Sequence, residues 1–261
     1  MRLEISCRKC SEQISLGQSG TVYSRLCLLR DDCVYKFECP EGHLTTTVLR
    51  TPKHEVLYSI GANALLDGYF RECISSFAGA LERYFEFGLR VIFRENEKRA
   101  SSLQEVWKLL VNQSERQFGA FITVWMMVTG EKYTSLALNQ IDKQTKVRNE
   151  VVHKGRIPTY AECMVYGQYV LDVIKPIEKI LIDRYAKAHK DECFALARKV
   201  MSDTSLPITV LSEFSVLSTA FRDDIEFESA LARLLDVRRR NSIYSNLPES
   251  FRSRTVFMSQ D

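Results

Sequence analysis

Arg148, Asn149 and His153 lie close together in the stretch VRNEVVHKGRIPT, residues 147–159. These residue types are suited to chemistry on a phosphodiester. Histidine titrates near neutral pH, so it can take a proton from a nucleophile or give one to a leaving group. Arginine stays charged and binds phosphate oxygens through paired donors. Asparagine can orient either the phosphate or the histidine. The alternative is a solvated helix end that carries a capping histidine.

The spacing of these residues limits how one chain could use them. In a helix, Asn149 and His153 are four apart and share a face. Arg148 and His153 point about 140° apart and lie about 7.5 Å apart along the axis. One copy of the helix therefore cannot easily direct both side chains at one atom, whereas two copies facing each other across a two-fold axis can. Gly155 can end this helix.

Cations surround the motif. Residues 142–156 carry five basic and two acidic side chains, a local charge of +3, which equals the net charge of the whole chain. Such a patch favours a phosphodiester ligand. We expect Lys146, Lys154 and Arg156 to contact the phosphates of such a ligand.

A second group of chemical residues lies near the N-terminus. Cys7 and Cys10 form a Cys-x2-Cys pair, and Cys39-Pro-Glu-Gly-His43 follows. Each pair can lie on a tight turn at the end of short antiparallel strands, with Pro40 and Gly42 supplying the required backbone dihedrals. Three thiolates and one imidazole in a closed tetrahedron are typical of a structural Zn²⁺ site. Metal binding would supply much of the folding free energy of so small a module.

Other interpretations of the cysteines remain open. Cys27 or Cys33 could replace His43 as fourth ligand, although neither lies on the second turn. All of these cysteines could also be unligated thiols. The pattern resembles a zinc ribbon, and ribbons contact nucleic acid, contact proteins or simply stabilise a fold. Cys73, Cys163 and Cys193 are scattered through helical sequence, where we expect buried, inert thiols.

The elements that must position these residues fall into three regions. Residues 1–50 are predicted to form a β-rich module. Residues 20–29 are rich in β-branched and apolar residues, residues 33–39 alternate strictly between two faces, and residues 43–50 could form a third short strand. Residues 56–186 have helical periodicity, with helices expected over 62–93, 103–112, 115–129, 134–153 and 159–186. Within them, Gly68 could divide the first helix, and Thr159 with Glu162 could form a capping box. Residues 187–261 are expected to be a helical extension with a polar tail from Asn246.

The helical region resembles a known family. The segment VRNEVVHKGRIPTYAECMVYGQYVLDVIKPI and the upstream segment SSFAGALERYFEFGLRV are similar to parts of a HEPN domain. The family motif of Arg, a polar residue, three variable residues and His matches Arg148, Asn149 and His153. The resemblance covers residues 56–186 and implies a dimeric helical bundle. It also suggests that Glu82, on the first core helix, faces the motif as a further catalytic residue.

The fold class predicted is therefore mainly α, a HEPN-like bundle preceded by a zinc ribbon. The resemblance implies a metal-independent endoribonuclease of toxin or antiviral type, which needs no cofactor for catalysis and leaves a 2′,3′-cyclic phosphate and a 5′-OH. RNA, a second copy of the chain and a neutralising or defence-system protein are the expected partners. The rivals are a non-catalytic HEPN dimer that binds nucleic acid or protein, and a ribbon that binds nucleic acid and uses the bundle only to dimerise.

Bulk composition sets wider limits. The chain has 261 residues, of which 45% are hydrophobic and 26% charged, as in ordinary globular proteins. The net charge of +3 is too small to indicate nucleic-acid binding by itself. No signal peptide is recognisable, and the longest apolar run, residues 121–128, is too short to cross a bilayer. We therefore expect a cytoplasmic protein that does not bind membranes.

Overall fold

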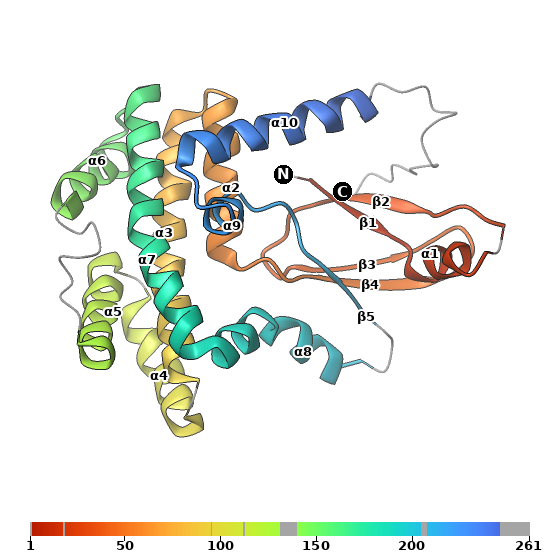
Figure 1. Ribbon diagram of the computed structural model, residues 1–261, viewed down its shortest axis with the longest axis horizontal. Helices are drawn as coiled ribbons and strands as arrows, with labels where there is room; N and C mark the ends of the chain where they lie inside the picture. The colour runs from red at the N-terminus through yellow and green to blue at the C-terminus, as the bar shows by residue number, and fades with distance from the viewer. Residues whose placement is uncertain are drawn as a thin grey trace. The chain divides into compact units, whose positions relative to one another are not determined.

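The computed structural model describes residues 2–17, 19–94, 96–111, 113–130, 140–204 and 208–245. Over these residues the protein is mainly helical, with small β-sheets near its N-terminus (Figure 1). Two compact units make up the chain. Of the described residues, the N-terminal unit contains those before Pro52, those in Phe194–Glu213 and those from Asp236 to Ser245. The helical unit contains Pro52–Cys193 and Phe214–Leu235.

The strands of the N-terminal unit form two sheets. Strand β1 (Arg2–Ser6) pairs antiparallel with β2 (Ser24–Leu28). Strand β4 (Leu44–Leu49) is the centre of the other sheet. It pairs antiparallel with β3 (Val34–Glu38) and parallel with β5 (Ile208–Leu211). The parallel pairing brings together segments about 160 residues apart, so this unit is built from both ends of the described chain.

Two whole helices and the end of a third belong to the N-terminal unit. Helix α1 (Arg8–Ser15) follows β1 directly, and α8 (Ala195–Ser202) packs against β4 and β5. The strands expected in 20–29, 33–39 and 43–50 are present as β2, β3 and β4. In β3, Tyr35 and Phe37 are buried while Lys36 and Glu38 are exposed, as the alternation predicts. The pattern did not reveal β1, α1 or β5.

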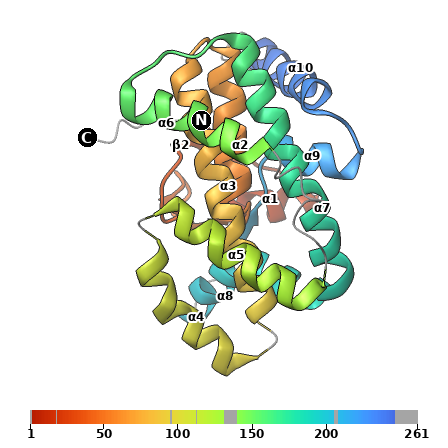
Figure 2. The same ribbon diagram turned by 90° about the vertical axis from the view of Figure 1, so that its left-hand side faces the viewer.

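The helical unit is built around two long helices. These are α3 (Phe70–Phe93) and α7 (Tyr160–Cys193), which run side by side (Figure 1). Helix α2 (Lys53–Leu66) packs along α3. Helices α5 (Ser114–Thr129) and α6 (Ile141–Lys154) both contact α3 as well (Figure 2).

Three further helices belong wholly or partly to this unit. Helix α4 (Glu97–Leu110) contacts α3 and α5, and α9 (Val216–Arg222) contacts α2. Helix α10 (Phe227–Ser245) begins in the helical unit. None of the helices within the described ranges is both long enough and apolar enough to span a membrane.

Backbone signals in the sequence set several helix ends. Gly68 has φ +80° and separates α2 from α3, so the predicted segment 62–93 is two helices. Gly155 has φ +70° and ends α6, as predicted. The expected helix 134–153 corresponds to α6 from Ile141, and its residues before 140 lie outside the described part of the chain. Tyr185 leaves the helical region within α7, close to the predicted end at 186.

The capping box before α7 is also present. The Thr159 backbone N–H donates to a Glu162 carboxylate oxygen at 2.8 Å, and the Glu162 N–H donates to the Thr159 hydroxyl at 3.2 Å. This reciprocal pair satisfies two donors that the start of the helix leaves free. Helix α7 therefore begins where the sequence indicates.

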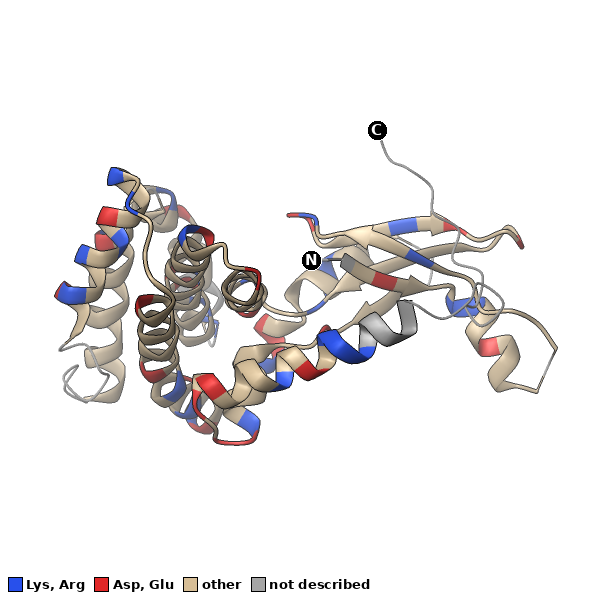
Figure 3. Ribbon diagram, turned by 90° about the horizontal axis from the view of Figure 1, so that it is seen from above, with Lys and Arg blue, Asp and Glu red and all other residues tan. Residues whose placement is uncertain are grey.

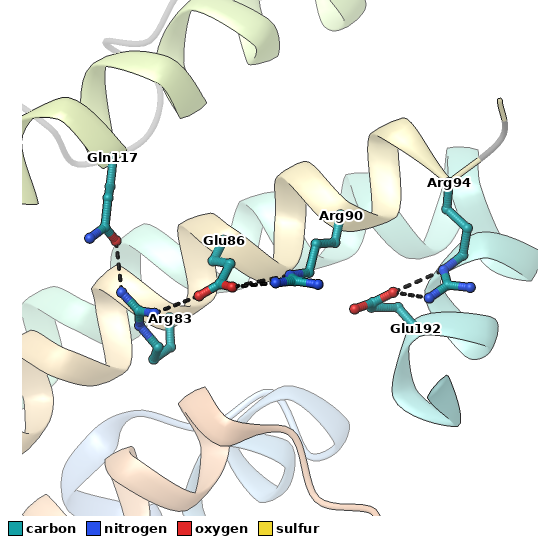
Figure 4. A network of polar contacts seen from close by, with 6 residues as sticks. All are labelled: Arg83, Glu86, Arg90, Arg94, Gln117 and Glu192. Carbon is teal, nitrogen blue, oxygen red and sulfur yellow. Dashed lines mark hydrogen bonds and ion pairs between the residues drawn. The ribbon is translucent and has the colours of Figure 1, made fainter. Parts of the chain in front are cut away.

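The hydrophobic core lies between α2, α3, α5 and α7. The helical periodicity predicts an apolar stripe on α3 from Phe70 to Leu89. Ile74, Phe77, Leu81, Phe85 and Leu89 are buried as predicted, whereas Phe70 at the helix start is only partly buried. Another face of α3 carries a row of ion pairs (Figure 4).

In that row, Glu86 lies between two arginines. Arg83 pairs with Glu86 at 2.6 Å and Arg90 pairs with it at 2.7 Å. Arg83 also donates to the side-chain oxygen of Gln117 on α5 at 3.0 Å, and Arg94 pairs with Glu192 on α7 (Figure 4). These contacts fix neighbouring helices against α3.

The C-terminal segment differs from its expectation. Residues 187–261 were expected to form one helical extension, but within this range Phe194–Glu213 belongs to the N-terminal unit and Phe214–Leu235 to the helical unit. Strand β5 explains the first assignment, because its parallel ladder with β4 ties it to the N-terminal sheet. The expected polar tail from Asn246 lies outside the described residues.

Candidate functional site

The first pair of cysteines lies at the junction of β1 and α1. Cys7 is the residue before the helix, and its backbone N–H donates to the Tyr23 carbonyl at 2.7 Å. Cys10 lies in the first turn of α1. The expectation of a tight turn is corrected here, because a strand-to-helix junction presents this pair. The unpaired N–H groups and dipole of a helix start favour thiolates at this position.

The second pair lies on the turn between β3 and β4. The Cys39 backbone N–H donates to the His43 carbonyl at 3.1 Å, and the Gly42 N–H donates to the Cys39 carbonyl at 2.8 Å. Gly42 has φ +73°, a conformation that glycine adopts without strain. The predicted role of Gly42 in this turn is therefore confirmed.

These two pairs meet in one cluster of three cysteines and a histidine. The ligand atoms of Cys7, Cys10, Cys39 and His43 all lie within 4.8 Å of one another. The Cys10 and Cys39 sulfurs are 3.8 Å apart, and the His43 Nδ1 is 3.5 Å from the Cys10 sulfur. Zinc bonds of about 2.3 Å to sulfur and about 2.0 Å to nitrogen imply tetrahedral edges of about 3.5–3.8 Å. The cluster can therefore hold a structural Zn²⁺ without a large rearrangement.

Acid–base properties of the thiols also suit a cation. Burial raises the pKa of Cys7, but hydrogen bonds, led by one from the Cys10 backbone, outweigh burial and lower the pKa to about 7. Burial, together with hydrogen bonds to the neighbouring thiols, raises the pKa of Cys10 to about 12. The Cys7 thiol thus loses its proton readily. The Cys10 thiol keeps its proton, because two adjacent thiolates would repel each other. A divalent ion would relieve that repulsion and displace the remaining protons.

The alternative ligands lie elsewhere. Cys33 has φ +54° before β3, and its thiol donates to the Arg30 carbonyl at 3.5 Å. Cys27 lies on β2. Neither cysteine belongs to the cluster. His43 is therefore its fourth member, as the sequence predicts in preference to Cys27 or Cys33.

The second candidate site centres on Arg148 of α6. The Arg148 guanidinium donates to Glu82 of α3 at 2.9 Å and to the Asn149 side-chain oxygen at 2.6 Å. It also donates to the Ser114 hydroxyl at the start of α5. Arg148 is 16% exposed and Glu82 29%, so the pair is partly shielded from water. The expectation that Glu82 faces the motif agrees with this contact.

His153 is separate from this group. It lies in the last turn of α6 and is exposed to solvent. Over the described ranges, no hydrogen bond or ion pair joins His153 to Arg148 or Asn149. A single chain therefore brings three of the four predicted catalytic residues into contact and leaves the histidine apart.

The predicted RNA-contacting cations differ among themselves. Lys146 and Lys154 are exposed and have no acidic partner among the residues that the structure describes. Arg156 instead pairs with Glu150 at 3.2 Å and Glu162 at 2.8 Å, so its charge is largely offset. Basic and acidic residues are interspersed along the helices (Figure 3). The surface near the motif is thus a small positive patch provided mainly by the two lysines.

Two residues beside Arg148 were missed in the sequence. Ser114 begins α5 and is brought to Arg148 by the packing of α5 and α6 on α3. Tyr166 of α7 is buried near the Arg148–Glu82 pair, and burial raises its pKa well above the usual range. Neither residue stands in a motif, so no local signal marked them.

A third polar cluster lies inside the bundle. The Tyr84 hydroxyl donates to one Glu178 carboxylate oxygen at 3.0 Å, and His189 Nε2 lies 2.7 Å from the other. The Cys193 sulfur lies 3.9 Å from His189 Nδ1. The rings of His54 and Tyr84 pack in a T-shaped arrangement with centroids 5.0 Å apart. Glu178 and His189 are only 10% and 17% exposed, which indicates a structural ion pair.

Comparisons with protein-family models, with curated proteins and with solved structures find no match to this chain. The resemblance to HEPN domains therefore depends on the motif residues and their surroundings alone.

Proposed function

We propose that the protein is a metal-independent endoribonuclease of HEPN type that cleaves RNA at a site shared by two chains. The arrangement of Arg148 carries this proposal. Its three hydrogen bonds to described residues use three of its five N–H donors, which leaves two for phosphate oxygens. A guanidinium fixed by Glu82 and Ser114 loses little conformational entropy when phosphate binds.

The reaction needs one base, one acid and one cation. His153 takes the proton of the ribose 2′-OH, and the 2′-oxygen forms a bond to phosphorus. The bond from phosphorus to the 5′-oxygen breaks, and that oxygen takes a proton from solvent water. Arg148 offsets the charge that develops on the phosphate. Products are a 2′,3′-cyclic phosphate and a 5′-OH.

The remaining motif residues position these groups. Asn149 accepts from Arg148 through its side-chain oxygen, so its amide group can donate to phosphate or to His153. Glu82 holds the guanidinium in place. Lys146 and Lys154 attract the RNA backbone, whereas Arg156 contributes less because two carboxylates already engage it.

A symmetric dimer completes the site. The two α6 helices would face each other near a two-fold axis, so that each active site combines Arg148 of one chain with the exposed His153 of the other. The separation of these two residues within one chain supports this arrangement. The N-terminal cluster would hold zinc for stability and take no part in the chemistry.

The decisive test measures RNA cleavage in the presence of EDTA. We expect the wild type to cleave and to leave cyclic phosphate ends. His153→Ala and Arg148→Ala should each lower the rate at least about 100-fold, the scale of a lost acid–base group. Asp142→Ala, an exposed change on the same helix, is the matched control. Full activity in His153→Ala would refute the proposal, as would activity lost only because the bundle unfolds.

A mixed dimer tests the sharing of the site. One chain lacking His153 and one lacking Arg148 together contain one intact pair, so the mixture should recover part of the wild-type rate. Neither variant alone should do so. A mixture as inactive as its components, with dimers confirmed by mass, would indicate that each chain works alone or that neither is catalytic.

The second candidate function is a non-catalytic dimer that binds nucleic acid or a partner protein. The ion pair between Arg148 and Glu82 favours this function. Glu82 partly neutralises the guanidinium and competes with phosphate for it. Binding of RNA without cleavage, unaffected by His153→Ala and weakened by Lys146→Ala, would support it.

A further inference from the structure

A cavity of about 720 Å³ lies within the N-terminal unit. It is bounded by residues 4–6 of β1, by one face of α1, by Thr47 of β4 and by all four residues of β5. A cavity above one face of a strand would contact alternate residues only. Contact with consecutive residues of β1 and β5 therefore indicates that the cavity runs along the edges of both strands.

Backbone hydrogen bonds identify those edges as unpaired. The Cys7 N–H donates to Tyr23, so in this antiparallel ladder Cys7 and Ile5 face β2. Glu4 and Ser6 consequently direct their N–H and C=O groups away from β2. On β5 the Leu211 carbonyl accepts from the Arg50 N–H of the chain that follows β4. Leu211 and Thr209, two residues earlier, therefore direct their backbone groups toward β4.

Ile208 and Val210 alternate with these two residues, so their backbone groups point away from β4. All four outward-directed residues, two on each strand, line the cavity. The Ile208 carbonyl accepts from the Arg8 guanidinium at 3.1 Å. Among the described residues, the other outward groups have no backbone partner. The two sheets thus present unpaired edges to a common cavity.

Two threonines lie beside these edges. Thr47 and Thr209 are register partners on β4 and β5 and line the cavity together. Their hydroxyl oxygens are shielded from solvent, so a ligand in the cavity cannot hydrogen-bond to them without a change of rotamer.

The charges at the cavity select among possible occupants. Arg8 and Glu12 pair at 2.6 Å and offset each other. Glu4 is exposed and has no ion pair within the described ranges, so the net charge of the lining is negative. A negative site disfavours the phosphates of nucleic acid and favours a basic side chain. Ile5, Leu16 and Leu211 provide apolar walls for an apolar neighbour.

We propose that this cavity binds an extended peptide segment of a partner protein, paired through its backbone with β1 and β5. The segment spans about four residues, or about 13 Å at the rise of a strand, which matches the length of β5. It carries apolar side chains and a Lys or Arg that pairs with Glu4. Such strand addition joins the two sheets through one shared strand. This proposal is independent of the proposed nuclease activity.

The test uses the full zinc-loaded chain and a phage-displayed library of random heptapeptides. We expect enriched peptides to contain alternating apolar residues and at least one Lys or Arg. In a synthetic copy of the best peptide, N-methylation of alternate backbone amides should weaken binding about tenfold each, since each change removes a hydrogen bond to a strand edge. Methylation of the intervening amides should have less effect.

Variants of the protein localise the binding. Val210→Pro removes an outward N–H without touching the ladder to β4. It should weaken peptide binding at least about tenfold, and Glu4→Gln should abolish the salt dependence of binding. Glu105→Gln on α4 is the matched control. Zinc content verifies that each variant has folded, and a chain ending after Ser245 shows whether the protein's own C-terminal residues compete.

Three outcomes would overturn the proposal. The first is that no peptide is enriched. The second is that binding tolerates methylation of every amide, which would exclude backbone pairing even if Val210→Pro failed to fold. The third is that single-stranded RNA displaces the peptide from the cavity, which would identify nucleic acid as its ligand.

Discussion

His189 and Glu178 show how a single buried pair ties stability to pH. Burial acts to lower the pKa of His189, but hydrogen bonds to Cys193 and Glu178 and the charge of Glu178 outweigh it and raise the value to about 10. For Glu178 the signs are reversed. Burial acts to raise the pKa of its carboxyl group, but the hydrogen bond to His189 and the charge of His189 outweigh burial and lower that pKa. The two residues therefore stabilise each other's charged forms inside the bundle.

His189→Gln should destabilise the protein in a pH-dependent way. Because the folded pKa of about 10 exceeds the unfolded value of 6.5, the stabilisation by His189 is fully present below pH 6.5 and is lost as pH rises toward 10. The difference in unfolding free energy between wild type and variant should shrink by more than about 1 kcal/mol between pH 7 and 9.5. Urea unfolding at both pH values measures it.

The same substitution in a Glu178→Gln background is the control. Without the carboxylate, replacing His189 should have an effect that changes little with pH over this range. A difference that stays constant in the wild-type background would contradict the role assigned to the pair.

At the scale of elements, close helix packing depends on small residues. Gly167 of α7 lies against Phe227 at the start of α10, and a Cβ at this position would come within 2.6 Å of the ring. The Gly167 carbonyl also accepts from the buried Tyr58 hydroxyl at 2.9 Å. Neither the ring nor the backbone can move away without disturbing the core formed with Phe77.

Gly167→Ala should therefore lower the free energy of unfolding by about 1–3 kcal/mol, the usual cost of overpacking. Gly119→Ala is the matched control, because Gly119 is an exposed helical glycine with nothing within 4 Å of the added methyl. Helix propensity predicts that this control gains up to about 1 kcal/mol. Thermal or urea denaturation of the two variants should move in opposite directions.

At the scale of the whole molecule, two units should respond differently to loss of metal. The Cys3His cluster joins β1, α1 and the turn between β3 and β4, so a bound ion would hold most of the N-terminal unit together. The core of the helical unit contains no member of the cluster. We expect one zinc per chain by elemental analysis, and its removal should unfold the first unit selectively.

Cys39→Ser tests this expectation by hydrogen exchange. Amides of β1, β3 and β4 should lose protection, and so should Ile208–Leu211, because β5 depends on β4 for its pairing. Amides of α3 and α7 should stay protected. Cys33→Ser, outside the cluster, should retain the zinc. Wild-type protein purified without zinc, yet fully protected in β1–β5, would contradict the metal's structural role.

The sequence by itself determined what depends on short-range patterns. The alternation of Tyr35 and Phe37 with polar residues gave β3, and the periodic stripe from Ile74 to Leu89 gave α3. Gly68, Gly155 and the Thr159–Glu162 capping box marked helix ends, because their effect on the backbone is local. The Cys3His set was also recognisable, since metal ligands have characteristic types and spacing.

Only the tertiary structure decided what depends on distant residues. Strand β5 is four residues long and is stabilised by pairing with β4, so its own sequence gave little indication of it. Ser114 reaches Arg148 because α5 and α6 both pack on α3, and the unpaired edges at Val210 and Ser6 arise from strand register. These features depend on residues far apart in the chain, which come together only when the whole unit folds.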